Sequence, residues 1–439
     1  MDINYHYYTI KTLAIHAGFD DEKAQFIAHF SQHIDDFIMH SPFIVDKEPP
    51  DFFHKNGLAN KIKNNKWVFS PCATGLNLIH TVSHSYQLDT LMPFHFITPK
   101  VNRGMPQNTD RGLYRCRAAN ENDNLLINQL MENTAKSVKP NDKTSLMALG
   151  MLLHTLSDTY AHCGFSGFHG WENESYIHKM THKIPQIQIR NIWPIELMKE
   201  KLKETVKENL NKNLKVKLRE AKESLEAMSP AEKAFYRALP SIGHANVSHA
   251  PDCCDCYISI YGKRTKDGAL ELLIERDNSV FFAECSRRVL DILCTINEKP
   301  KFNDIEWANL QEKLAVAQNS RTNDNSKTIR RKWMEIFPNI NYSYKKNEFI
   351  RIELNLVHHD TKLTDRLEVS KSELTDIYSE KGDKARISSL ILARNVNDLF
   401  YTYNELAYRH VFNVNGGYAS HSNFTRLSTY SNLVLAATV

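Results

Sequence analysis

The chain has 439 residues, of which 42% are hydrophobic and 24% charged, a balance that excludes a mainly disordered protein. Its 15 glycines and 15 prolines are few for this length, so the composition favours a mostly helical protein. A net charge of +4 is too small to indicate a nucleic-acid-binding protein, and no apolar run reaches the roughly 18 residues that a transmembrane helix requires.

The predicted helices follow one another along most of the chain. Two occupy residues 2–40, and a polar loop at 41–70 precedes a helix over 73–91 that Pro93 is expected to end. After a loop at 98–112, further helices are expected at 120–136, 143–162, 194–227, from Ser229 onward behind a capping box, and at 275–297, 303–317 and 326–336.

The pattern changes near residue 340. Ile350, Ile352, Leu354 and Leu356 alternate with polar residues, which predicts a half-buried strand. A second strand near 366–370 would complete a β-hairpin, and a last helix over 388–412 would return to the core. We therefore predict an all-α fold with a small β-hairpin insertion near 340–370. Its domains are a helical metal-binding catalytic domain at 1–335, a β-containing insertion at 336–387, and a C-terminal helix with a tail at 388–439.

The positions of the histidines and the number of cysteines indicate which kinds of functional site the chain can form. Sixteen of the 20 histidines precede residue 250, which places the expected chemistry there. The eight cysteines do not make a disulfide framework, so we expect reduced thiols. The sequence CCDC at 253–256 lacks a second pair of the metal-binding type and is interpreted as structural.

The most specific pattern is formed by His154, Asp158 and His162. Their spacing of four residues places all three on one stripe of a helix, since each step of four advances by about 40°. The helix is otherwise apolar, and burying ionisable groups without partners costs several kcal/mol. Two imidazoles and a carboxylate suit zinc. The alternative is a hydrogen-bonded core network without metal.

Four weaker groupings accompany this stripe. They are Asp2 with His6, His29 and His33 with Asp35 and Asp36, His80 or His84 with His95, and His244 with His249 or Asp252. Three of them also have a structural interpretation, in which Asp2 serves only as a helix cap, the aspartates as a solvated helix end, and the segment at 244–252 as a polar turn.

Taken in order, these groups resemble the ligands of the zinc-dependent phospholipase C and P1 nuclease superfamily. The segments MDINYHYY, SQHIDD, PFHF, HTLSDTYAHCGFSG and IGHANVSHAPD are similar to the Pseudomonas/Legionella-type zinc metallophospholipase C family in particular. The resemblance spans roughly residues 1–300. It implies an all-α metallohydrolase core with two or three zinc ions, held by Asp2, His6, Asp36, His84, His95, His154, Asp158, His162, His244 and His249, with Asp2 in the place of the family's N-terminal donor.

The function implied by this resemblance is zinc-dependent phosphoester hydrolysis. We expect a phospholipase C that removes phospholipid head groups through a metal-bound hydroxide, with Asp35 or Asp36 bridging two metals or orienting the attacking water. The expected partner is a phospholipid membrane surface and not a nucleic acid. The start of the chain shows no cleavable signal, so we expect synthesis in the cytoplasm and release, if any, by a non-classical route into the medium or a host cell. The alternatives are a P1-like single-strand nuclease and a metal-stabilised scaffold without catalysis.

Overall fold

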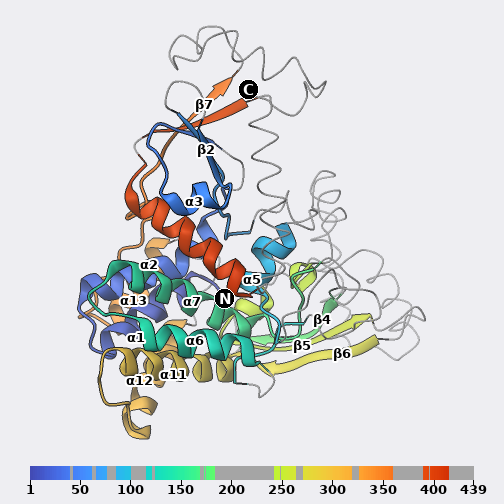
Figure 1. Cartoon of the computed structure of the whole chain (residues 1–439). Coiled ribbons are helices and arrows are strands. Elements are labelled where there is room, and N and C mark those ends of the chain that lie inside the picture. Colours follow the sequence, from blue (N-terminus) through green and yellow to red (C-terminus); the bar gives the residue numbers. More distant parts are fainter. Residues whose placement is uncertain are drawn as a thin grey trace. The chain divides into compact units, whose positions relative to one another are not determined.

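The computed structural model divides the chain into two compact units (Figure 1). Unit 1 comprises Met1–Gln32, Asn77–Lys100 and Pro106–Ser343, and unit 2 comprises His33–Leu76, Val101–Met105 and Tyr344–Val439. The structure describes residues 1–39, 43–61, 66–76, 86–99, 115–120, 124–168, 173, 175–182, 242–247, 249–263, 270–318, 326–358, 389–394 and 396–414.

Helices build most of unit 1. They are η1 (Asn4–Thr9), α1 (Ile10–His16), the first part of α2 (Asp21–Asp36), η4 (Gln87–Leu91), α5 (Met92–His95), α6 (Leu125–Ser137), α7 (Lys143–Ala161), α11 (Asn278–Ile296), α12 (Asp304–Gln318) and α13 (Ser326–Ile336), with short 3-10 turns η6 (Ala245–Val247) and η7 (Ala250–Asp252). The apolar helix α7 is buried from Leu149 to Ala161 and packs against α6, α11 and η1. Asp142 caps its first turn by accepting a hydrogen bond from the backbone of Ser145.

Unit 1 also contains a three-stranded antiparallel sheet in the order β4-β5-β6. Its strands are β4 (Ser175–His182), β5 (Cys256–Lys263) and β6 (Leu270–Asp277). Sequence analysis expected no strand before residue 340, so the all-α prediction is corrected to a mostly helical fold with a small β part. Asp277 ends β6 and caps α11, which is why that helix begins at Asn278 and not near 275.

Unit 2 contains a five-stranded sheet in the order β2-β3-β1-β8-β7. Its strands are β1 (Phe43–Val45), β2 (Ala59–Lys61), β3 (Trp67–Phe69), β7 (Glu353–His358) and β8 (Ser389–Arg394), and the short helix α3 (Asp51–Lys55) lies between β1 and β2 in the sequence. Residues 41–70 were predicted as a loop, but their short apolar runs pair as strands.

The predicted hairpin near 340–370 is also corrected. The strand β7 begins later than expected, at Glu353, and pairs with β8. Because β8 also pairs with β1, the two strands are part of the sheet and not an appendage. Residues 389–394 were predicted as helix, whereas the last helix occupies 398–414. The predicted strand at 366–370 lies outside the described residues.

The remaining helix predictions have mixed outcomes. The two N-terminal helices, the helix at 143–162 and those at 303–317 and 326–336 are confirmed to within a few residues. Pro93 was wrongly expected to end a helix; it stands at the start of α5, where a missing N–H costs nothing. The predicted helix at 194–227 and the one after Ser229 lie outside the described residues. In the part of the chain that is described, no helix is long and apolar enough to cross a membrane.

Candidate metal centre

The helix α7 supplies the centre of the site. His154 and Asp158 lie on one face of α7, and His162 follows directly as its C-terminal cap. Gly150, one turn before His154, allows α2 to approach closely, since a Cβ atom there would lie 2.4 Å from the carbonyl oxygen of Ile27. The close packing explains how His154 reaches the backbone of α2.

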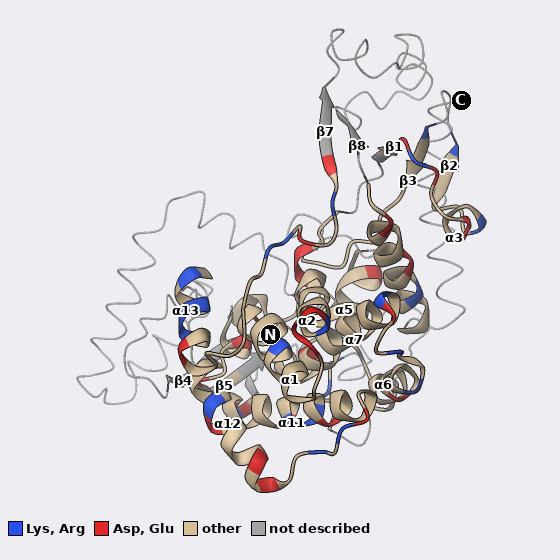
Figure 2. Ribbon diagram, turned by 90° about the vertical axis from the view of Figure 1, so that its left-hand side faces the viewer, with Lys and Arg blue, Asp and Glu red and all other residues tan. Residues whose placement is uncertain are grey.

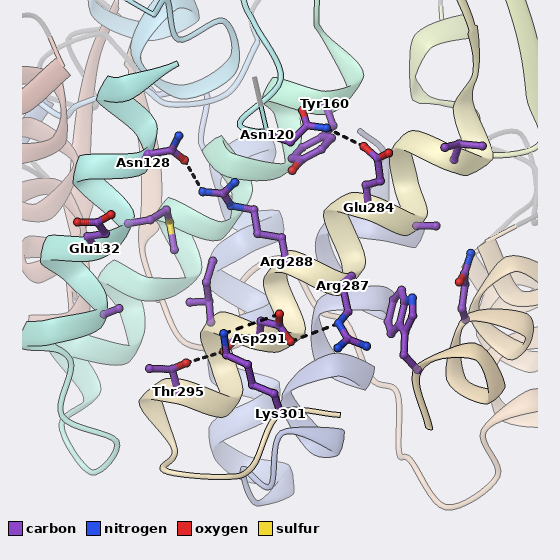
Figure 3. A pocket seen from close by; sticks show the side chains of 17 residues that line it. Asn120, Asn128, Glu132, Tyr160, Glu284, Arg287, Arg288, Asp291, Thr295 and Lys301 are labelled. Atoms are coloured by element: carbon purple, nitrogen blue, oxygen red, sulfur yellow. Dashed lines mark hydrogen bonds and ion pairs between the residues drawn. The ribbon is translucent and has the colours of Figure 1, made fainter. Parts of the chain in front are cut away.

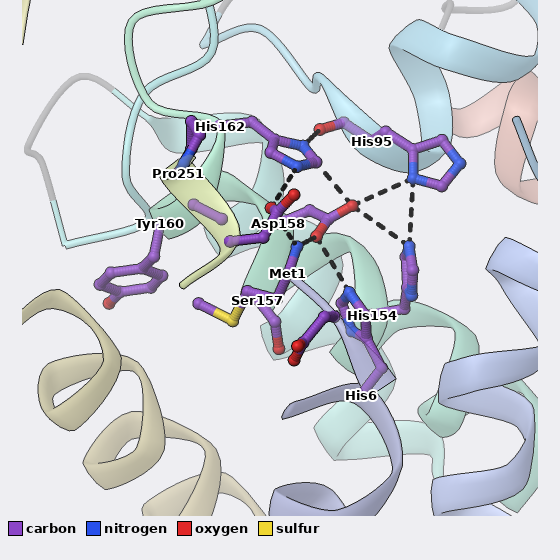
Figure 4. Close-up of polar contacts among 12 residues, drawn as sticks. Met1, His6, His95, His154, Ser157, Asp158, Tyr160, His162 and Pro251 are labelled. Carbon is purple, nitrogen blue, oxygen red and sulfur yellow. Dashed lines mark hydrogen bonds and ion pairs between the residues drawn. The ribbon is translucent and has the colours of Figure 1, made fainter. Parts of the chain in front are cut away.

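A first group of polar residues surrounds the carboxylate of Asp158 (Figure 4). Its Oδ1 atom lies 2.5 Å from the backbone amine of Met1 and 3.1 Å from Nε2 of His6. Its Oδ2 atom lies 3.0 Å from Nδ1 of His95 and 3.2 Å from Nε2 of His154. The carboxylate is almost completely buried, so all of these contacts form in a region of low polarity.

Asp252 organises a second group next to the first. Its Oδ1 atom lies 3.2 Å from the amine of Met1 and 3.3 Å from Nε2 of His162. Its Oδ2 atom lies 3.6 Å from Nε2 of His244 and 3.7 Å from Nδ1 of His249. The Met1 amine therefore stands between two buried carboxylates, one from each group.

Two of the histidines have their tautomer fixed by backbone carbonyl groups. Nδ1 of His154 lies 2.8 Å from the carbonyl oxygen of Ser31, and Nδ1 of His162 lies 2.7 Å from that of His95. A carbonyl oxygen only accepts, so each Nδ1 must carry the proton and donate it. The Nε2 lone pair of both rings is then available to a cation, an arrangement typical of metal-ligating histidines.

Burial and charge set the protonation states of the cluster. Burial, together with the neighbouring His154, lowers the pKa of His6 to about 4, so this imidazole is neutral at pH 7. Burial alone would raise the pKa of Asp158, but His162, the Met1 amine, His154 and His6 outweigh it and hold that pKa well below its ordinary value. Neutral imidazole and ionised carboxylate are the forms that bind metal.

Burial and Asp252 act together on Asp2, which the resemblance placed among the ligands. They raise the pKa of its carboxyl group to about 6 against the opposing effect of Asn4. Its two oxygens accept hydrogen bonds from the backbone and side-chain amides of Asn4, each at 3.0 Å. In this structure Asp2 thus caps the first helical turn, and the backbone amine of the preceding residue is the atom that faces Asp158.

Arg276 and Asn278 connect the C-terminal end of α7 with the loop that carries Asp252 by hydrogen bonds. The guanidinium of Arg276 is buried and donates to the carbonyl oxygens of Tyr160 and Ala161, each at 2.7 Å, at the end of α7. Its Nε atom donates to Oδ1 of Asn278 at 2.8 Å. A cation at a helix C-terminus is also favoured by the helix dipole.

Asn278 extends this connection to the loop that carries Asp252. Its amide nitrogen donates to the carbonyl oxygens of Ala250 and Cys253 at 2.9 and 2.8 Å. These residues flank Asp252 on both sides. The hydrogen bonds therefore fix the distance between the end of α7, with His162, and the segment with Asp252.

The donor atoms fit a divalent metal such as zinc. His95, His154 and Asp158 offer ligand atoms within 4.8 Å of one another, and so do His162, His244 and Asp252. Both sets consist of two imidazoles and a carboxylate, a common ligand set for catalytic zinc. Nδ1 of His6 is buried and makes no hydrogen bond among the described residues, which is consistent with a position that binds an ion.

The structure brings six of the predicted residues together around the two carboxylates of Asp158 and Asp252. His6, His95, His154, Asp158, His162 and His244 converge as described. Asp252, which sequence analysis left as an alternative to His249, is the carboxylate of the second group, while the exposed His249 contacts it from outside. His80 and His84 lie outside the described residues.

Asp35 and Asp36 belong to unit 2, at the end of α2. The carboxylate of Asp36 accepts a hydrogen bond from the hydroxyl of Tyr344 and lies 3.6 Å from Nζ of Lys346. Burial raises its pKa despite both of these neighbours. Asp36 is therefore already engaged by two side chains of its own unit.

Sequence reasoning missed the supporting residues. The Met1 amine, Arg276 and Asn278 belong to no ligand motif, and the carbonyl groups of Ser31 and His95 carry no side-chain signal. Arg276 stands between Glu275 and Asp277 in the sequence, so no local pattern indicated that its charge would be buried.

A cavity of about 740 Å³ lies elsewhere in unit 1, between α6, α11 and α12 (Figure 3). Tyr160 contributes to its wall, and this residue is two positions from Asp158, which is roughly the opposite side of a helix. Arg287 and Arg288 line it together with Glu284 and Asp291. No predicted ligand lines this cavity, so it is separate from the metal centre.

Comparison with known proteins identifies a family but not a function. No curated protein and no solved structure matches the chain. A family model described as a family of unknown function, DUF6765, matches residues 1–415, which is nearly the whole chain. The chain therefore belongs to the DUF6765 family.

Proposed function

We propose that this protein is a zinc-dependent phosphoester hydrolase, most specifically a phospholipase C. The observation that carries the proposal is the pair of adjacent ligand groups around Asp158 and Asp252, each with two imidazoles and one carboxylate. If these two groups hold zinc, the metal would lower the pKa of a water molecule at the site and would stabilise negative charge on a phosphoryl group. The resemblance to the zinc phospholipase C superfamily supports the same assignment.

The protein's own residues would perform three tasks. Ser31 and the carbonyl of His95 hold the rings of His154 and His162 with Nε2 toward the site. Arg276 and Asn278 keep the two groups at a fixed separation. His249 contacts Asp252, and its side chain is 69% exposed. Substrate would therefore approach the site from the side on which His249 lies.

A carboxylate at the end of α2 is proposed to orient the attacking water. Sequence analysis offered Asp35 and Asp36 for this role. The hydrogen bond from Tyr344 and the nearby Lys346 engage Asp36, so we favour Asp35.

A phospholipid substrate is favoured over a nucleic acid. In the view of Figure 2, basic and acidic residues both occur along the described helices of unit 1, and the net charge of the chain is only +4, which does not favour a nucleic acid. The choice of lipid rests on the family resemblance, so the experiment must include both substrates.

The deciding experiment measures hydrolysis of phosphatidylcholine vesicles, single-stranded DNA and a chromogenic phosphodiester, with and without a chelator. We expect chelator-sensitive release of phosphocholine. Cleavage of DNA but not of vesicles would replace the phospholipase with a nuclease. Stoichiometric zinc without any hydrolysis would support a structural metal centre instead.

A matched pair of variants gives the control. His154→Ala removes an imidazole of the centre, and His54→Ala removes an imidazole of unit 2 that contacts the carbonyl of Pro49 and the ring of Trp67. We expect His154→Ala alone to abolish hydrolysis and to reduce bound zinc. Equal activity of the two variants would contradict the proposal.

A further inference from the structure

The sequence Cys253-Cys254-Asp255-Cys256 forms a turn that connects the 3-10 turn η7 to β5, whose first residue is Cys256. The backbone N–H of Cys256 donates to the carbonyl oxygen of Cys253 at 3.4 Å, which closes a four-residue turn. The ends of such a turn lie less than about 7 Å apart between Cα atoms, and disulfides span roughly 4.4 to 6.8 Å. The backbone therefore places the first and last cysteines of the segment within bonding range.

The side chains support this pairing of Cys253 with Cys256. The thiol of Cys253 is a direct electrostatic neighbour of the Cys256 thiol, while the thiol of Cys254 is directed to Oε1 of Gln318 at 3.3 Å. All eight cysteines of the chain are thiols in this structure. The turn thus holds one facing pair and one cysteine that is turned away from it.

The two paired thiols differ in a way that suits two different chemical roles. Cys253 is partly exposed, whereas Cys256 is completely buried. An external reagent can reach the first thiol but not the second. The thiol of Cys256 also donates to Oδ1 of Asp255 at 3.6 Å, so a buried carboxylate stands ready to accept its proton.

We propose that Cys253 and Cys256 are a redox-active pair that reacts with a low-molecular-weight disulfide. The thiolate of Cys253 attacks one sulfur of the reagent, forms a mixed disulfide and releases the first thiol. Cys256 then passes its proton to Asp255 and attacks the sulfur of Cys253, which closes the internal disulfide and releases the second thiol. Two protein thiols are oxidised, and one external disulfide is reduced to two thiols.

The surrounding contacts favour closure with little rearrangement. Asn278 already fixes the carbonyl of Cys253 at 2.8 Å, so the turn is held in shape before the bond forms. The neighbouring Cys253, burial and Asp255 together raise the pKa of the Cys256 thiol, so it stays protonated until its partner has reacted. This order of events prevents a reagent from being trapped on the buried cysteine.

The test uses the full-length native protein with oxidised glutathione, followed by mass spectrometry of peptides. We expect an internal disulfide between Cys253 and Cys256 that dithiothreitol reverses. The Cys256→Ser variant should stop at a glutathione adduct on Cys253, and the Cys253→Ser variant should form neither product at Cys256. Asp255→Asn should accumulate the mixed disulfide, because the second step lacks its proton acceptor.

The matched control is Cys254→Ser, which changes the neighbouring thiol in the same turn. We expect it to form the internal disulfide at the rate of the unchanged protein. No oxidation at Cys253, or a glutathione adduct that never resolves in the unchanged protein, would overturn the proposal. These readouts need no metal and no hydrolytic activity, so they stand apart from the function proposed above.

Discussion

Asp158 illustrates how one residue can determine the character of a site. Its carboxylate faces an amine and four imidazoles, and burial leaves no solvent to compensate for its loss. Removing one partner from such a buried set costs more than the set contributes as a whole, because the remaining groups keep their desolvation penalty.

The first prediction is that Asp158→Asn loses bound metal and unfolds more easily. The amide keeps the shape but not the charge, so we expect zinc content to fall below half of the original and stability to fall by about 3 kcal/mol. Metal analysis and chemical denaturation measure the two effects. The control is Asp142→Asn, which alters an exposed helix cap. Unchanged zinc in Asp158→Asn would mean that the stripe on α7 is only a core network.

A second prediction concerns the adjacent aspartates. Asp35→Asn should reduce hydrolysis at least about 100-fold, the size of a general-base effect, with zinc retained. Asp36→Asn should retain most activity, because Tyr344 and Lys346 already occupy that carboxylate. The ratio of kcat values of the two variants is the measurement. A larger loss in Asp36→Asn would reverse the assignment.

A third prediction follows from His29, whose pKa burial lowers to about 3. In the unfolded chain the same group has a pKa near 6.5, so only the unfolded state takes up this proton as the pH falls from about 6.5 to about 3. Stability contributed by the neutral ring is thus complete above pH 6.5 and declines below it, by at most about 1.4 kcal/mol per pH unit.

His29→Leu should therefore give metal-free protein a shallower loss of unfolding free energy between pH 6.5 and 4.5. Denaturation at four pH values in the presence of chelator measures the slope. His54→Leu, which removes a partly exposed imidazole, is the control. Equal slopes for His29→Leu and the unchanged protein would show that His29 is not the titrating group.

At the scale of elements, hydrophobic periodicity predicted the helices, because their formation depends mainly on residues close together in the sequence. The stripe at His154, Asp158 and His162 was visible because a helix repeats on a fixed period and α7 is apolar elsewhere. The strands were missed because residues 43–45 and 67–69 are too short to show a period, and because one partner of β1 is β8, over 300 residues away in sequence. The same limit applies to Asp252, which long-range contacts with Arg276 and Asn278 position.

The fourth prediction tests that connection between elements. Arg276→Lys keeps the charge but cannot donate to two carbonyl groups and to Asn278 together. We expect the second ligand group to lose its metal while the first keeps it, so that zinc per chain falls by about one ion of the two or three expected for this type of centre. Cobalt substitution and its absorption spectrum distinguish the two groups.

Arg288→Lys is the matched control for this experiment. It changes a partly buried arginine of α11 that donates to Ala119 and Asn128 and contacts no ligand among the described residues. An equal loss of metal in both variants would indicate general destabilisation. Full metal content in Arg276→Lys would show that the connection does not position Asp252.

At the scale of the whole molecule, the two units are expected to be stabilised by different interactions, unit 1 by metal binding and unit 2 by the pairing of its strands. Both ligand groups lie in unit 1, on α5, α7 and the segment 244–252. Unit 2 is held by the pairing of β1 with β3 and β8 and by a buried aromatic cluster around Phe53, Phe69 and Tyr401. A ligand that binds only the folded state stabilises the part that binds it.

The last prediction is that removing metal weakens unit 1 selectively. Without a cation, Asp158 and Asp252 keep the Met1 amine and the histidines as partners among the described residues, and metal binding no longer contributes to folding. Hydrogen exchange should accelerate in α7 and in residues 250–253 after chelation, while β1 and β3 keep their protection. Added zinc should restore slow exchange in the unchanged protein but not in His154→Ala. Acceleration in both units together would mean that they unfold as one cooperative body, and no acceleration in either would mean that the histidine and aspartate groups hold their geometry without a metal.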